Sequence, residues 1–116
     1  MDRLRFLQLV EEALERLPRR FKQKLDNVAV LVEDYPEKGL ERQYSGVLLG
    51  LFHGVPKTRQ SFFSLDMPSQ IVLYQKNIES VCEDELEISC QIEKTLKHEI
   101  GHYFGLSEKD LRRKGY

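Results

Sequence analysis

Two of the three histidines in this 116-residue chain stand four residues apart, within the stretch LKHEIGHYFGLSE that runs from Leu96 to Glu108. On an α-helix, residues four apart differ by only about 40° around the axis and about 6 Å along it, so His98 and His102 project from one face. Two imidazoles placed in this way can share one ion. The spacing therefore predicts a metal site on a helix.

Glu99 follows the first of these histidines and lies about 100° around the helix from it. That offset suits a general base better than a ligand. In the HExxH arrangement, a carboxylate takes a proton from a water held by zinc, while the metal lowers the pKa of that water toward about 7 and polarises the carbonyl under attack. The motif predicts a zinc site with Glu99 as its catalytic base.

A third ligand is expected just beyond the helix. Gly105 comes one residue after Phe104, where a helix that ends in a left-handed residue favours glycine, so the chain should turn back sharply. The turn can carry Glu108 under the ion as a third ligand, with the fourth position left to water. A second interpretation coexists with this one: Ser107 and Asp110 resemble a capping box for a final helix, EKDLRRK, whose N-terminus Glu108 would favour.

Four other side chains are weaker candidates for the same cleft. His53 follows a predicted strand and could reach the site, although a lone loop histidine is more often an ordinary surface residue. Tyr74, Tyr103 and Tyr116 are candidate hydrogen-bond donors to an oxyanion, and packing is the plainer interpretation of each.

The elements that position these residues follow from the apolar pattern. A first amphipathic helix should begin at the N-cap Asp2 and end near Pro18, and Pro18 can open a second short helix through Phe21 and Leu25. The last helix should run from about Glu83 to Phe104, and its histidine face should point away from its buried side. Core residues expected on the first helix are Phe6, Leu7, Val10, Leu14 and Leu17, and on the last helix Leu96, Ile100 and Tyr103.

Three strands are expected between these helices. NVAVLVEDYP has the continuous apolar character of a buried strand, and VLLGLFHGVP reads as a second strand with Gly50 inside it. QIVLYQ, from Gln70, is the third, while PEKGLERQYSG reads as a loop. The order of elements predicts a single α+β domain over residues 1–116, in which a small mixed three-stranded sheet packs with an N-terminal helix and a C-terminal active-site helix.

Charge and hydropathy argue against nucleic-acid-binding and membrane-bound classes of protein. The 18 basic and 19 acidic residues leave a formal charge of -1, which gives no sign of a nucleic-acid arm or a membrane-surface anchor. The longest apolar runs are far shorter than the ~20 residues that cross a bilayer. The N-terminus does not resemble a secretory signal, so a cytoplasmic location is expected. Net charge does not reveal partners or the oligomeric state.

With these motifs in place, the sequence resembles the short bacterial minimal zincins, a group of zincin-like metallopeptidases. The likeness runs from LPRRF and LDNVAVLVEDYP, through LLGLFHGVPKT and IVLYQKNIE, to HEIGHYFGLSEKDL, which is the most specific stretch. The resemblance implies a minimal zincin-like fold, with His98 and His102 as zinc ligands and Glu99 as the general base. Glu108 would occupy the third-ligand position.

The sequence departs from the zincin pattern in three places. Relatives usually carry aspartate at the position of Glu108, so the turn must absorb an extra methylene, and they often have another histidine at the position of Tyr103. Larger zincins continue into a methionine-bearing turn beneath the metal, whereas the eight residues after Glu108 include no methionine. By analogy with those enzymes, VLLGLF would be an antiparallel edge over the cleft, to which an extended peptide adds as another strand while Gly50 permits close backbone approach.

The sequence thus predicts a zinc-dependent hydrolase of peptide bonds, acting on a peptide or protein substrate. One alternative is a noncatalytic zinc-binding or peptide-binding domain. It is favoured because the sequence lacks the methionine-bearing turn that forms the lower wall of the site in larger zincins. Another is a metal-dependent ribonuclease with phosphate contacts from basic side chains, against which the balanced charge and the zincin glutamate argue. The basic residues in question are Arg19, Arg20, Lys22, Lys24, Arg112, Arg113 and Lys114.

Overall fold

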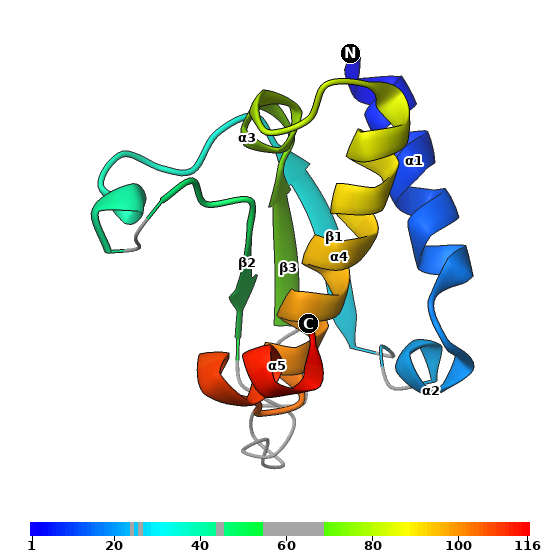
Figure 1. Ribbon diagram of the computed structural model, residues 1–116, viewed down its shortest axis with the longest axis vertical. Coiled ribbons are helices and arrows are strands. Elements are labelled where there is room, and N and C mark those ends of the chain that lie inside the picture. Colours follow the sequence, from blue (N-terminus) through cyan, green and yellow to red (C-terminus); the bar gives the residue numbers. More distant parts are fainter. Residues whose placement is uncertain (24, 26, 44–45, 55–68) are drawn as a thin grey trace.

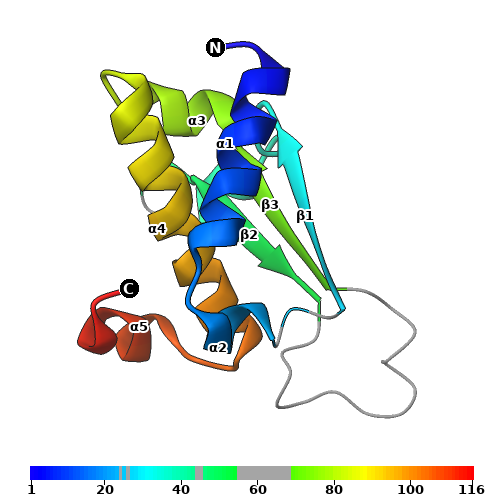
Figure 2. The ribbon, with the colours of Figure 1, turned by 90° about the vertical axis from the view of Figure 1, so that its right-hand side faces the viewer.

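A computed structural model describes residues 1–23, 25, 27–43, 46–54 and 69–116, which form helices packed against one sheet (Figure 1). Helices α1 and α4 lie side by side and cover the same face of the sheet (Figure 2). The elements in chain order are α1 (Arg3–Arg16), α2 (Arg19–Lys22), β1 (Val28–Glu33), the 3-10 turn η1 (Leu40–Gln43), β2 (Gly50–His53), β3 (Ser69–Tyr74), α3 (Gln75–Ser80), α4 (Glu85–Tyr103) and α5 (Glu108–Lys114).

The sheet is mixed, with the strand order β1-β3-β2. Strand β1 runs parallel to β3 and pairs Val28 with Ser69, whereas β2 runs antiparallel to β3 and pairs Gly50 with Leu73. The central strand β3 is almost wholly buried, and β2 forms one edge. This arrangement confirms the predicted α+β class with a small mixed three-stranded sheet.

Helix α1 begins as its sequence predicts, because the side chain of Asp2 accepts a hydrogen bond from the backbone N–H of Arg5 at 2.8 Å. The predicted core stripe was wrong at one position: Leu7 is 40% exposed. Leu7 lies about 100° around the helix from Phe6, which turns it out of the interface. Leu9 and Ala13 are buried instead, at i+3 and i+7 from Phe6.

Other predicted boundaries also shift. Strand β1 is only half-buried, with Leu31 40% exposed, because it lies at a sheet edge and helices α1 and α4 cover only one face. Strand β2 begins at Gly50 and does not contain it as an internal residue, and α2 ends at Lys22, before Leu25. The short helix α3 was not predicted, and η1 interrupts the predicted loop.

Helix α4 confirms the long final helix and sets the orientation of the site. Its N-cap Asp84 accepts from the backbone N–H of Glu87 at 2.8 Å. A buried line at intervals of four residues packs against α1 and the sheet, and its members are Ile88, Ile92, Leu96 and Ile100. Of the helices described, none is long and apolar enough for a bilayer span.

Candidate metal centre

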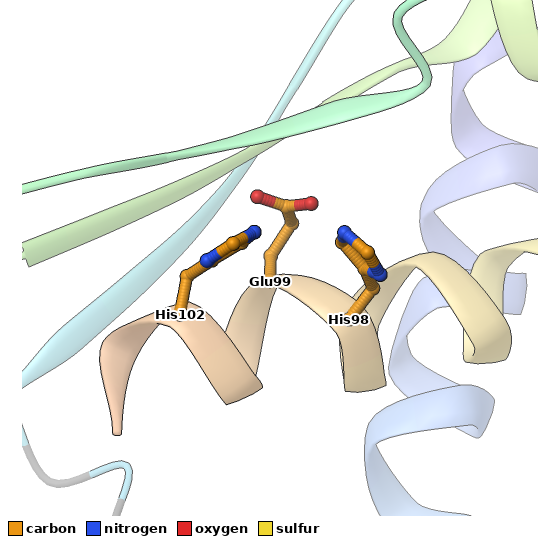
Figure 3. Close-up of side chains that lie close together, drawn as sticks. All are labelled: His98, Glu99 and His102. Carbon is orange, nitrogen blue, oxygen red and sulfur yellow. The ribbon is translucent and has the colours of Figure 1, made fainter. Parts of the chain in front are cut away.

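The HExxH motif occupies the last two turns of α4. The rings of His98 and His102 have centroids 5.1 Å apart, and the potential ligand atoms of His98, Glu99 and His102 all lie within 4.8 Å of one another. Figure 3 shows the carboxylate of Glu99 between the two imidazoles, reaching toward the strands. The predicted i, i+4 geometry therefore brings the two histidines together, and Glu99 lies beside them.

The chain reverses sharply after α4, as the glycine predicts. Gly105 has a φ of 85°, in the left-handed region, and the backbone N–H of Leu106 donates to the carbonyl of Gly101 at 3.0 Å. Ser107 then caps α5 in a capping box with Asp110. The turn and the cap together place Glu108 at the first position of α5, under the two histidines.

Glu108 contacts both imidazoles with one oxygen. Its Oε1 lies 3.1 Å from Nε2 of His98 and 2.7 Å from Nε2 of His102. Partial burial alone would raise the pKa of Glu108, but hydrogen bonds from His98 and His102, in the charged form in which each Nε2 carries a hydrogen, outweigh burial and lower it. The carboxyl group is therefore poised to be an anion, the form that binds a cation.

Main-chain oxygens fix the orientation of both rings. Nδ1 of His102 lies 3.0 Å from the carbonyl oxygen of Leu106, and Nδ1 of His98 lies 3.3 Å from the main-chain oxygen of Tyr116. A main-chain oxygen only accepts, so each Nδ1 must carry the hydrogen of these bonds. In the neutral rings the lone pairs are then on the two Nε2 atoms, which face Glu108.

This arrangement fits a divalent cation. Three lone-pair atoms converge from two neutral imidazoles and one carboxylate, and they repel one another unless a proton or a cation lies among them. Ligands at 2.0–2.1 Å around a tetrahedral zinc lie about 3.3 Å apart. The 3.1 Å from Glu108 Oε1 to His98 Nε2 is close to this value, and the 2.7 Å to His102 Nε2 is shorter. Two nitrogens and one oxygen are also a donor set that zinc commonly takes.

Glu99 differs from Glu108 in that its carboxyl group is buried. It is only 6% exposed, and its Oε1 accepts a hydrogen bond at 2.9 Å from the backbone N–H of Phe52 in β2. Burial raises the pKa of Glu99 above its usual value of 4.5, and the nearby histidines and the Phe52 N–H offset this only in part. A carboxyl group with a raised pKa is suited to accept and return a proton.

The site opens into a cleft of about 790 Å³ between β2 and α4. One wall is apolar and comes from β2 and the residues just before it, and the other is the face of α4 that carries His98 and His102. Residues of the turn after α4 also line the cleft. The lining residues are Val47–Phe52, Gly54, Gln91, Lys94, Thr95, His98, Glu99, His102, Gly105–Glu108 and Tyr116.

The four weaker candidates do not place a side-chain donor group in the site as the sequence suggested. His53 is exposed at the end of β2 and is not among the residues that line the cleft. Tyr74 and Tyr103 are both 1% exposed, and the Tyr103 ring packs on Phe52 at a centroid distance of 5.8 Å. Tyr116 reaches the site through its main chain, while its hydroxyl accepts from Arg20 at 3.3 Å.

Gly50 also lets β2 pack closely on α4, a role that the sequence did not indicate. A Cβ at this position would lie 2.8 Å from Cγ2 of Thr95 and 3.1 Å from the carbonyl oxygen of Val72. Glycine at this position therefore permits the close approach of β2 to α4. This contact brings the backbone of β2 within reach of Glu99.

Sequence reasoning missed the main-chain groups of the site. The N–H of Phe52 and the main-chain oxygens of Leu106 and Tyr116 each hold one functional side chain. Every residue carries such groups, so no residue type marks them in a sequence. Lys94 was also missed, although it precedes His98 by one helical turn and so lies on the same face of α4.

Gly101 lets α5 pack onto α4, which yields a prediction about stability. A Cβ at Gly101 would lie 2.2 Å from Cδ2 of the fully buried Leu111. We expect Gly101→Ala to lower the free energy of unfolding by about 1–3 kcal/mol, as overpacking typically does. The cost should shrink in a Leu111→Ala background, measured by urea unfolding of the four proteins of the cycle. An equal cost in both backgrounds would rule out this contact as the cause.

Comparison with known proteins places this fold and site in a family. The profile of the zincin-like metallopeptidases matches residues 25–116, so the chain belongs to that family. A solved structure of a conserved hypothetical protein from Thermus thermophilus is similar to it, with 30% identity and a TM-score of 0.61 over 90% of this chain and 94% of the other. No curated protein gives a significant match.

Proposed function

We propose that this protein is a zinc-dependent peptidase formed by one domain over residues 1–116. The observation that carries the proposal is the placement of Glu99 beside His98 and His102, whose Nε2 atoms both contact Glu108, in a cleft bounded by the edge strand β2. Membership of the zincin-like metallopeptidase family supports the same reaction class. The substrate would be a peptide or protein in extended conformation.

We assign His98, His102 and Glu108 as the zinc ligands. Glu99 also lies near the imidazoles, but its Oε1 already accepts from Phe52 and its carboxyl group is buried, whereas Glu108 Oε1 contacts both Nε2 atoms. Bound there, zinc would act as a Lewis acid toward the scissile carbonyl and would lower the pKa of a water. The bonds from each Nδ1 to a main-chain oxygen keep the imidazoles aimed at the ion.

Glu99 would move the proton. Among the described residues, every buried side-chain oxygen has a hydrogen-bond partner. Glu99 Oε2 makes no hydrogen bond within the described part of the chain, whereas Oε1 accepts from Phe52. Oε2 is therefore not fully buried, and we infer that it is open to the cleft. Oε2 can take a proton from the attacking water and deliver it to the leaving amine. The Phe52 N–H holds Oε1 meanwhile, which keeps the carboxylate from rotating away.

Strand β2 would orient the substrate. The carbonyl of Leu49 accepts from the N–H of Tyr74 in β3, so by the alternation of an antiparallel pair the main-chain groups of Gly50 and Phe52 point to the free edge. The N–H of Phe52 already donates to Glu99. A peptide could therefore pair with Gly50 and with the Phe52 carbonyl, next to the catalytic carboxylate.

Cleavage of a mixed peptide library tests the proposal. We expect the zinc-loaded protein to cleave peptides, the chelated protein to be inactive, and readdition of zinc to restore cleavage. Stoichiometric zinc binding with thermal stabilisation but no cleavage of any peptide would reject the enzymatic function and indicate a binding domain.

A further inference from the structure

The cleft continues along α4 beyond the histidines, and its far part contains one basic side chain. Gln91 and Lys94 line it there, opposite Val47, Leu48 and Leu49. Lys94 is exposed, and none of the ion pairs among the described residues involves it, whereas the neighbouring Lys97 pairs with Glu93 at 3.4 Å. This end of the cleft thus combines an apolar wall with an uncompensated positive charge.

The direction of a bound peptide follows from two contacts. Gly50 faces Thr95, and Phe52 donates to Glu99, so β2 and α4 run in the same direction. A peptide that pairs antiparallel with β2 would run the opposite way, from the Phe52 end of the strand toward the Gly50 end. The residues that follow its scissile bond would then lie toward Lys94.

The distances match a position close to the scissile bond. Lys94 precedes His98 by four residues, which is about 6 Å along the helix. An extended peptide rises about 3.4 Å per residue, so this span corresponds to roughly two residues. The lysine amine carries three hydrogen-bond donors on a flexible stem, which suits it to bind a carboxylate at this range.

We propose that Lys94 forms a subsite for a carboxylate on the C-terminal side of the scissile bond, either the free C-terminus of a short peptide or an acidic side chain. This inference rests on the proposed peptidase function and names its substrate class. Specificity would come from the uncompensated charge, and the apolar wall would accept the adjoining side chain.

Peptide binding to the zinc-loaded Glu99→Gln protein tests this subsite without turnover. Matched peptides would carry a free C-terminus or an amide, and Glu or Gln two residues after the scissile bond, with affinity measured by calorimetry. We expect one of the two carboxylates to tighten binding roughly two- to fivefold, as for an exposed ion pair. Added Lys94→Met should abolish the gain, while Lys94→Arg and the control Lys97→Met should retain it.

Equal binding of the carboxylate and neutral peptides, no binding of either, or a carboxylate preference that survives Lys94→Met would overturn the inference. A preference that survives would point to the metal as the anion site. Cleavage of a library without any carboxylate preference would remove the subsite and leave the peptidase. Lys94-dependent binding without cleavage would support the subsite and reject the peptidase activity, so the two proposals fail separately.

Discussion

Replacing Glu99 with Gln should reduce peptide cleavage by about 10²- to 10⁴-fold in kcat, the usual contribution of a general base. Glutamine keeps an oxygen that can accept from the Phe52 N–H, so the backbone of β2 need not move. Its amide cannot take up a proton, however, and proton transfer from the attacking water is lost. The measurement is the initial rate on one peptide selected from the library, at saturating zinc.

A matched variant controls for the change of charge on the same helix. Glu93 also lies on α4, where it pairs with Arg16 and Lys97 outside the cleft. Glu93→Gln should therefore retain cleavage, and both variants should retain zinc. Equal rates for Glu99→Gln and the wild type would exclude Glu99 as the base.

The same variant should change how the stability of the metal-free protein depends on pH. Because burial raises the pKa of Glu99 above 4.5, its charged form is disfavoured in the folded state. The free energy of unfolding should then decrease as pH rises from 4.5 through the folded pKa, and Glu99→Gln should remove this decrease. With chelator present, urea unfolding should find the variant more stable at neutral pH, with the difference vanishing below 4.5.

The second large effect is expected at Glu108. Glu108→Ala removes the proposed third ligand, so zinc affinity should decrease by more than the roughly 10- to 100-fold typical for the loss of an outer-shell partner. Competition with a chromophoric chelator measures the loss. Glu108→Asp should bind zinc more tightly than Glu108→Ala, since aspartate keeps the charge. Unchanged affinity in Glu108→Ala would leave only the helix-capping role.

That helix-capping role can be measured separately. Glu108 is the first residue of α5, where a negative charge favours the helix N-terminus, while Ser107 and Asp110 form the capping box. Glu108→Gln keeps the size of the side chain but removes its charge. It should therefore weaken zinc binding strongly and lower the stability of the metal-free protein only slightly, because the capping box remains.

The parts of the site that could be predicted are those encoded by local spacing. The i, i+4 histidines, the glycine at the end of α4 and the capping box of Ser107 and Asp110 on either side of Glu108 all depend on contacts within a few residues. The existence of the three strands and the buried side of α4 also followed from the apolar pattern. Such patterns hold because the geometry of a helix or a strand is the same in any fold.

The parts that could not be predicted depend on contacts distant in sequence. Nothing near Phe52 indicates that its N–H meets Glu99, 47 residues later. Leu31 has the apolar character of a core residue, yet it is exposed because its strand lies at a sheet edge. Gly50 packs closely against Thr95, 45 residues later, and no local pattern indicates this contact.

Zinc titration of the metal-free protein, against a competing chelator, tests the central claim most directly. We expect one zinc per wild-type chain, full retention in His53→Ala, and loss of detectable binding in the double variant His98→Ala/His102→Ala, whose chain keeps α4 because alanine favours helix. Absence of zinc binding by the wild type, or undiminished binding by the double variant, would contradict it.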